Sequence, residues 1–159
     1  MPTIFSVLLL VLQLTAASIS VPRNGDTSLV GFWVTQDLDW VVEINDCQTG
    51  FCGELVGLSQ SASSNALRTD MQNPDRARRG LSLCGLAVMG SFRPSKGTAG
   101  QWEGGWVYDP QDGKTYLGKM RLDGPDTLNV RGYVFVPLFG RDETLSRETG
   151  PINRCSPAL

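Results

Sequence analysis

Acidic side chains are the residues of this chain that come nearest to a catalytic arrangement. Asp109 and Asp112 lie close together, with Glu103 upstream, and paired carboxylates supply the acid and the base in glycoside hydrolysis. However, Asp109 precedes Pro110 and Asp112 precedes Gly113, which is typical of turns in which an aspartate accepts backbone N–H groups. We therefore interpret Asp109 and Asp112 as structural residues, and a carboxylate-based enzyme is the less favoured alternative.

A second polar group, Asp70, Asn73 and Asp75, offers oxygen ligands at close spacing. The regular alternate ligands and terminal glutamate of a calcium loop are missing. Three arginines nearby would repel a cation: Arg76, Arg78 and Arg79. We predict a helix N-cap or a local Asp–Arg network here, with no metal and no cofactor.

The overall composition excludes several classes of function. Histidine is absent, which removes Ser-His-Asp and Cys-His nucleophile pairs and most zinc sites. The 14 basic and 16 acidic residues give a net charge of −2, whereas proteins that bind nucleic acid present basic faces. With 159 residues, 41% of them hydrophobic, the chain is expected to form one globular domain that does not bind nucleic acid.

The N-terminus has the pattern of a secretory signal peptide. Residues 4–18 are mostly apolar and end in small side chains, and the first charged residue is Arg23. We predict a signal peptide over residues 1–20, cleaved between Ser18 and Val21, and an exported protein, periplasmic by preference and extracellular as the alternative. Because no Lys or Arg precedes the apolar run, an uncleaved anchor is a second alternative. The run is short for a bilayer span, and the processed protein is not expected to span the membrane.

Four cysteines are compatible with two disulfides in an oxidising compartment. They are Cys47, Cys52, Cys84 and Cys155, which allow three pairings. Cys47 and Cys52 flank what resembles a hairpin loop, so we prefer Cys47–Cys52 and Cys84–Cys155. Free thiols are the alternative.

Short β-rich segments alternate with turn signals along the rest of the chain, a spacing typical of a sandwich or barrel. After a flexible segment at 21–29, a single domain is predicted over 30–159. Its expected strands are 30–35, 40–45, 51–58, 86–92, 101–108, 115–122, 127–136 and 143–147. The exception is a long polar loop over 59–84, with a short helix near 74–79. We predict an all-β fold, a small closed antiparallel up-and-down barrel of about eight strands, because closure removes unpaired strand edges.

An ordered series of short phrases resembles one bacterial family. The phrases are Gly31-Phe32-Trp33, Cys52-Gly53, Asp70 with Asn73-Pro74-Asp75, Tyr108-Asp109-Pro110, Asp112-Gly113-Lys114-Thr115-Tyr116, Arg131-Gly132-Tyr133 and Phe139-Gly140-Arg141. Together they are similar to the domain-of-unknown-function family 2147 (DUF2147), from about Gly31 to Arg147. The resemblance implies an exported, lipocalin-like (calycin-like) β-barrel of unassigned activity.

A Gly-x-Trp start with an arginine on the last strand also resembles the lipocalin superfamily, in which the guanidinium covers the indole and closes the barrel base. Trp33 and Arg147 are the corresponding residues here, and the resemblance implies a structural role for both. A cation–π contact of this kind contributes roughly 0.5–2 kcal/mol. One departure is that the last strand reads Thr144-Leu145-Ser146-Arg147, without the tryptophan that the bacterial family commonly carries there.

Aromatic residues are numerous enough to line a pocket in the mouth of such a barrel. The candidate ligand-binding residues are Trp106, Tyr108, Tyr116, Tyr133 and Arg131. If the strand face of Arg131 and Tyr133 looks inward, the buried guanidinium needs an anionic partner. The leading hypothesis is a module that binds a small apolar or amphipathic molecule. The alternative is an envelope protein with a filled barrel that recognises another protein through Pro137-Leu138-Phe139 or the long loop, and the oligomeric state stays open.

Overall fold

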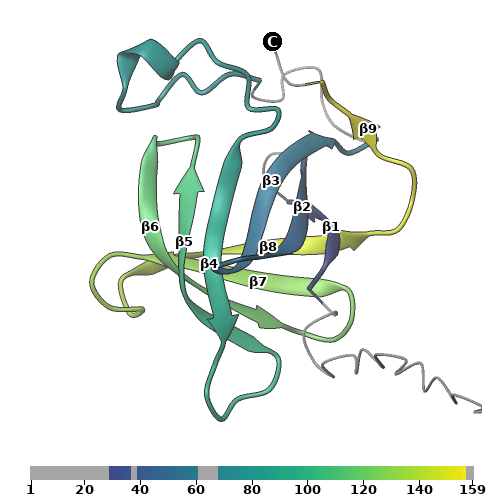
Figure 1. The fold of residues 1–159 in the computed structure, drawn as a ribbon, viewed down its shortest axis with the longest axis vertical. Helices are drawn as coiled ribbons and strands as arrows, with labels where there is room; N and C mark the ends of the chain where they lie inside the picture. Colours follow the sequence, from purple (N-terminus) through teal and green to yellow (C-terminus); the bar gives the residue numbers. More distant parts are fainter. Residues whose placement is uncertain (1–28, 37–38, 61–67, 157–159) are drawn as a thin grey trace, which may run out of the picture.

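The computed structural model describes residues 29–36, 39–60 and 68–156, which form an antiparallel β structure with a short helix (Figure 1). The predicted signal peptide and nearly all of the segment that follows it lie outside the described residues. Within the described ranges, no helix is long and apolar enough to cross a membrane. The elements are β1 (Gly31–Thr35), β2 (Trp40–Cys47), β3 (Gly50–Leu58), the 3-10 helix η1 (Arg76–Arg78), β4 (Ala87–Pro94), β5 (Gln101–Asp109), β6 (Lys114–Leu122), β7 (Thr127–Tyr133), β8 (Gly140–Glu148) and β9 (Asn153–Arg154).

Strands β1 to β8 close into a barrel in which consecutive strands are antiparallel neighbours. The order is β2-β1-β8-β7-β6-β5-β4-β3, and an additional β2–β3 pairing completes the ring. The first and last barrel strands meet at Trp33 and Arg147, which are paired in the β1–β8 register. The short strand β9 extends beyond the ring and pairs with β3 at Gly57 and Leu58. The predicted closed up-and-down barrel is confirmed.

The predicted strands agree with the observed ones except around the β7–β8 connection and at the short strand β9, which was not predicted. The segment predicted as a strand over 127–136 leaves the sheet after Tyr133. Phe135 has a positive φ of 65°, and Pro137 has no N–H to donate to a ladder, so the chain turns back there. Strand β8 consequently starts at Gly140, earlier than expected, and Gly140 pairs with Tyr133.

One half of the barrel is filled by large side chains. Phe92 of β4 is fully buried, and its ring lies over β5 and β6, which both have glycine at the point of contact. A Cβ built on Gly105 or Gly118 would come within 2.5 Å of that ring, so neither position tolerates a side chain without a shift. Trp102 packs edge-on against Phe51 with ring centroids 6.2 Å apart.

The same end of the barrel is closed by Trp33. Its side chain is fully buried, and its indole Nε1 donates to the carbonyl oxygen of Leu29 at 2.8 Å. The Arg147 guanidinium lies over the Trp33 ring, 4.1 Å from the centroid, where the lipocalin resemblance placed it. Arg147 Nε also donates to the carbonyl oxygen of Pro125 at 2.8 Å, which connects the β6–β7 turn to this end.

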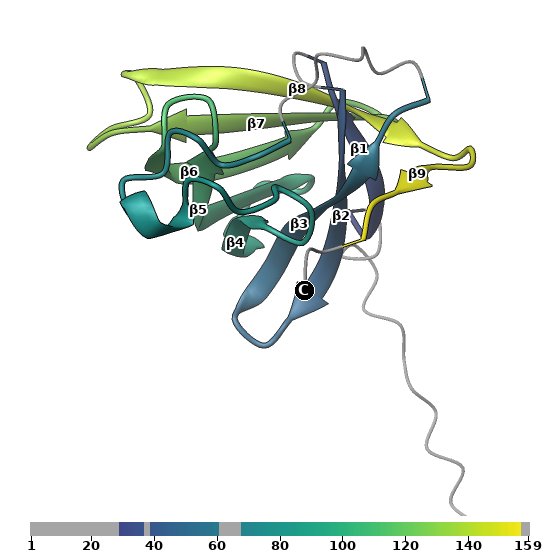
Figure 2. The same cartoon turned by 90° about the horizontal axis from the view of Figure 1, so that it is seen from above.

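Both preferred cysteine pairs are joined in the structure. Cys47 and Cys52 bridge the β2–β3 hairpin, while Cys84 and Cys155 connect the end of the long loop to the segment after β9. Val56 adds a backbone contact, because its carbonyl oxygen accepts from the Cys155 N–H at 3.0 Å. Figure 2 shows β9 beside β3, away from the β5–β6 side of the barrel.

Candidate functional site

A cavity of about 500 Å³ occupies the barrel end opposite Trp33. Its apolar lining consists mainly of inward side chains of the strands. These are Trp40, Val42, Leu55, Val88, Met89, Val107, Val130 and Leu145. Apart from Trp40, these residues are aliphatic or of medium size, whereas the other half has Phe92, Trp33 and Trp102. This difference in volume leaves the space open.

Strand alternation explains which residues reach the cavity. On β7, Leu128 and Val130 are buried, and Val130 lines the cavity. Gly132, the next inward position, leaves room for Tyr116, whose Cβ would lie 3.3 Å from a Cβ added at Gly132. On β6, Met120 is 2% exposed while the neighbouring Leu117 is 51% exposed. The period-2 alternation of side chains along each strand thus sets both the apolar wall and the wet outer face.

The polar part of the cavity rim lies on and around the β5–β6 turn and at the start of β8. Its members are Tyr108, Asp109, Gln111, Tyr116, Arg141, Asp142 and Glu143. Asp109 Oδ1 accepts the Gln111 N–H at 2.8 Å, and Asp112 Oδ1 accepts the Lys114 N–H at 3.0 Å. Both aspartates are therefore parts of the turn.

Two tyrosines of this rim donate their hydroxyls to carboxylates. Tyr116 donates to Asp112, and this hydrogen bond, with burial, raises the pKa of Tyr116. Burial and a 2.7 Å hydrogen bond to Asp70 raise the pKa of Tyr108. Both side chains are consequently neutral hydrogen-bond donors across the physiological range, and neither is a base.

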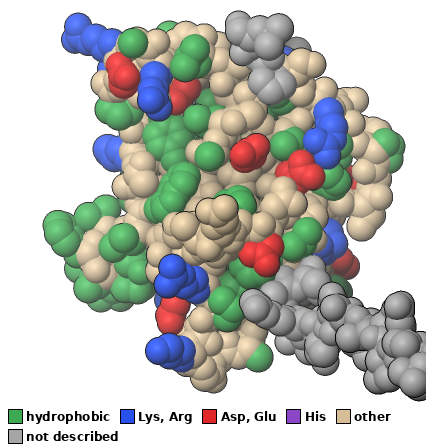
Figure 3. Space-filling view, viewed as in Figure 1, with side chains coloured by type: hydrophobic (Ala, Val, Ile, Leu, Met, Phe, Trp, Pro, Cys, Tyr) green, Lys and Arg blue, Asp and Glu red, His purple; other side chains and the backbone are tan. Residues whose placement is uncertain are grey.

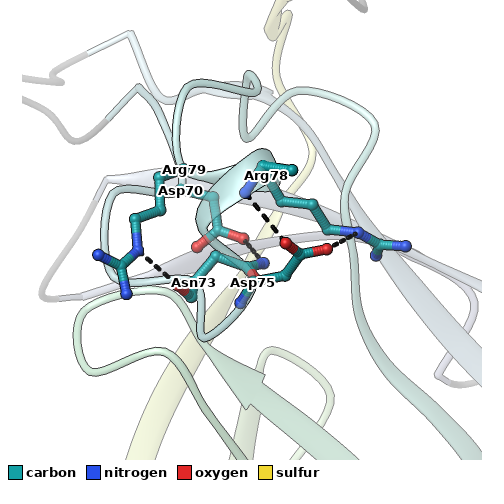
Figure 4. Close-up of polar contacts among 6 residues, drawn as sticks. Asp70, Asn73, Asp75, Arg78 and Arg79 are labelled. Atoms are coloured by element: carbon teal, nitrogen blue, oxygen red, sulfur yellow. Dashed lines mark hydrogen bonds and ion pairs between the residues drawn. The ribbon is translucent and has the colours of Figure 1, made fainter.

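The long loop is fixed to the rim through Asp70, which is 2% exposed. Asp70 Oδ1 accepts from Tyr108, and Oδ2 accepts from Asn73 Nδ2 at 2.6 Å. Figure 4 shows Asp70 and Asn73 beside the short helix η1, whose N-cap Asp75 accepts the Ala77 N–H at 3.0 Å. The predicted helix cap is confirmed, although the buried carboxylate pairs with an amide and a phenol instead of an arginine.

Two arginines of the long loop make further contacts beside the helix η1. Arg78 forms an exposed ion pair with Asp75 at 3.5 Å, and Arg79 Nε donates to the Asn73 carbonyl oxygen at 2.8 Å. Within the ranges that the structure describes, no three His, Cys, Asp or Glu side chains are grouped so that they could hold a metal ion. These contacts hold the long loop against the β5–β6 end of the barrel.

Replacing Tyr108 by phenylalanine is expected to lower the free energy of unfolding by about 1–3 kcal/mol, because buried Asp70 loses one of its two side-chain hydrogen bonds. Urea unfolding followed by circular dichroism measures this loss. Tyr133→Phe is the matched control, since the Tyr133 hydroxyl has no hydrogen bond within the described part of the chain, and a change within about 0.5 kcal/mol is expected. Equal effects of the two substitutions would contradict the assigned contact.

Among the candidate ligand-binding residues, Tyr108 and Tyr116 line the cavity, whereas Trp106, Arg131 and Tyr133 are absent from its lining. Trp106 lies against Gly90, where an added Cβ would come within 2.9 Å of the indole. Tyr133 pairs with Leu117 of β6 at the end of β7. These residues belong to the barrel wall.

The inward orientation considered for Arg131 is wrong. Val130 is the inward residue, and Arg131 is bonded to Asp142 on the adjacent strand. Its Nε also donates to the Pro137 carbonyl oxygen at 2.6 Å. The guanidinium thus has its anionic partner within the chain, and the argument for a bound anion at Arg131 fails.

The ligand-binding residues chosen from the sequence did not include Trp40 and Arg141. Trp40 is 3% exposed and lines the cavity, and its indole Nε1 is buried without a hydrogen-bond partner. Arg141 lies at the rim and pairs with Gly132 in the β7–β8 register. The sequence pattern that could have identified Arg141 is the alternation on β8, which places Arg141, Glu143 and Leu145 on one face of the strand.

Comparisons with known proteins agree with this fold. Residues 31–147 match the family described as an uncharacterised protein conserved in bacteria (DUF2147). A solved structure of the Helicobacter pylori protein HP1028, described as belonging to the lipocalin family, superposes with a TM-score of 0.63 at 21% sequence identity, covering 76% of this chain and 83% of that chain. No curated protein matches the sequence. The chain belongs to the DUF2147 family.

Proposed function

We propose that this member of the DUF2147 family is an exported binding module that holds a small apolar or amphipathic molecule in the open end of its barrel. The observation that carries the proposal is the cavity of about 500 Å³ with its apolar wall. Ligand sites in proteins are typically concave spaces of roughly 300–1,000 Å³ lined by apolar side chains with a few polar groups. The lipocalin-like fold supports the same function.

The lining specifies the character of the ligand. Val42, Val130 and Leu145 would contact an apolar body, which is favourable at about 25 cal/mol per Å² of apolar surface removed from water. Arg141 at the rim and the unpartnered Nε1 of Trp40 would serve hydrogen-bond acceptors of the ligand, while the Tyr116 hydroxyl, which donates to Asp112, could accept a hydrogen bond. An amphipathic molecule with an oxygen-bearing end satisfies both sets of groups.

Export is part of the proposal because of the cysteines. The two pairs Cys47–Cys52 and Cys84–Cys155 are disulfides, and disulfides persist in oxidising compartments such as the bacterial periplasm. The predicted signal peptide supports the same compartment. We place the protein in the periplasm, with passage out of the cell as the alternative.

Filling the cavity tests the proposal. Val130 is a buried residue that lines the cavity, so Val130→Phe adds a ring at the cavity wall and reduces the space that a ligand could occupy. The variant is expected to retain its unfolding midpoint and to bind the neutral apolar dye Nile red at least about tenfold more weakly, which corresponds to about 1.4 kcal/mol. Fluorescence titration measures the affinity.

The control is Leu117→Phe, which adds a ring to the outer wall at a side chain that is 51% exposed. Its dye affinity is expected to equal that of the wild type. If Val130→Phe binds the dye as well as the wild type, the dye sits elsewhere and the cavity is not the binding site. If the wild type binds no dye, the proposed function is not supported for neutral apolar molecules.

A further inference from the structure

The β7–β8 connection carries an uninterrupted apolar surface. Residues 134–139, here called the apolar tip, read Val-Phe-Val-Pro-Leu-Phe. Their exposed fractions are large: Val134 46%, Phe135 89%, Val136 46%, Leu138 80% and Phe139 71%. Exposed apolar clusters of this kind mark protein or membrane contacts in soluble proteins, whereas single exposed residues do not.

The outward position of the apolar tip is held by the chain itself. The Phe139 N–H donates to the Val136 carbonyl oxygen at 3.1 Å, and Arg131 Nε donates to the carbonyl oxygen of Pro137 at 2.6 Å. Phe135 has a φ of 65°, a conformation that is uncommon for a bulky residue. Strained backbone conformations of this kind cluster at functional sites and are not expected in a surface loop that has no function.

The apolar tip stands at the mouth of the cavity. Leu138 and Phe139 are exposed on the outside and also line the cavity, so the apolar wall continues from the interior onto the tip. Figure 1 shows the β7–β8 connection projecting from the barrel at the left, and Figure 3 shows hydrophobic side chains gathered at the same place. A partner that covers the apolar tip therefore also lies against the mouth of the cavity.

The shape and size of the apolar tip favour a bilayer over a protein partner. Stable protein interfaces use about 20–30 residues on each side, whereas the tip is a single short projecting connection. Between Tyr133 and Gly140 the sequence contains no charged residue. Arg141 follows the tip at the start of β8, and an arginine at such a position keeps its charged end in the polar headgroup layer while the apolar part is buried.

We infer that the apolar tip inserts into the surface of a lipid bilayer and brings the mouth of the cavity against the membrane. An apolar cargo could then pass between the bilayer and the barrel without crossing water. This docking surface goes beyond the proposed cavity function, because tip insertion requires only the side chains of residues 134–139.

Vesicle co-sedimentation tests the inference with the processed, disulfide-bonded protein and vesicles of phosphatidylcholine alone. The test variant is Phe135→Asp with Val136→Asp, because neither residue lines the cavity and aspartate tolerates positive φ better than phenylalanine. The partition coefficient is expected to fall at least about tenfold, which corresponds to about 1.4 kcal/mol. The matched control is Thr98→Asp with Ala99→Asp, which adds the same charges to the exposed β4–β5 turn at the other end of the barrel and should bind vesicles like the wild type.

Two results would overturn the inference: a wild type that does not sediment with these vesicles, or a wild type that forms dimers which the tip variant dissolves, since the tip would then contact a second copy. The Val130→Phe variant separates the two proposals. It is expected to keep vesicle binding while it loses dye binding, and the tip variant should do the reverse. Loss of both properties in either variant would mean that docking and cavity binding are one event, contrary to the inference.

Discussion

Replacing Cys84 and Cys155 together by alanine should lower the free energy of unfolding by about 4 kcal/mol, because the disulfide closes a long loop in the unfolded chain. The two cysteines are 71 positions apart. Removing the bridge also releases β9, whose backbone pairs with β3 at Gly57 and Leu58. Urea unfolding under non-reducing conditions measures the difference between the variant and the wild type.

The matched comparison is the double alanine variant of Cys47 and Cys52, which lie only 5 positions apart. The same loop-closure argument gives a loss of about 2 kcal/mol for this bridge. A smaller loss for the Cys84–Cys155 variant than for the hairpin variant would contradict the assignment of the long bridge as the main constraint on the unfolded chain.

Trp33→Ala should destabilise the barrel by about 3–5 kcal/mol, the range for truncation of large buried aromatics. Trp33 is fully buried and supports Arg147, which lies over its ring. The substitution leaves a void at the closed end and an arginine without its aromatic partner. Thermal and urea unfolding measure the loss, and dye binding at the open end should survive in the folded fraction.

Trp33→Phe separates the contribution of the aromatic contact with Arg147 from that of the indole hydrogen bond. Phenylalanine keeps an aromatic face for Arg147 but loses the Nε1 bond to the Leu29 carbonyl oxygen, so a smaller loss of about 1–3 kcal/mol is expected. A Trp33→Ala variant that is as stable as the wild type would show that the closed end does not depend on this stack.

Much of the barrel could be predicted from the sequence because its signals are local. Alternation on β6 puts Met120 and Leu117 on opposite faces, and the structure buries the first and exposes the second. The aspartates at Asp109 and Asp112 indicated a turn that their hydrogen bonds form. The β7–β8 connection was different. The apolar residues 134–136 have strand propensity, but Pro137 and the positive φ of Phe135 take them out of the sheet.

The candidate site was less accessible to prediction because it depends on contacts between distant segments. The alternation on β7 grouped Arg131 with Tyr133 but could not show which face looks inward, and the pairing of Arg131 with Asp142 is visible only in three dimensions. The cavity itself arises from a difference in side-chain volume between the two halves of the barrel, which no motif encodes. Likewise, the contact between Asp70 and Tyr108 spans 38 positions.

Native mass spectrometry of the protein purified from its own cells, beside the Val130→Phe variant prepared in the same way, tests the central claim most directly. The predicted result is a wild type that carries a small organic molecule, recoverable in an organic extract, and a folded variant that carries none. The same passenger on both proteins, or a wild type that carries none and takes up no apolar probe, would contradict a ligand-binding cavity at Val130.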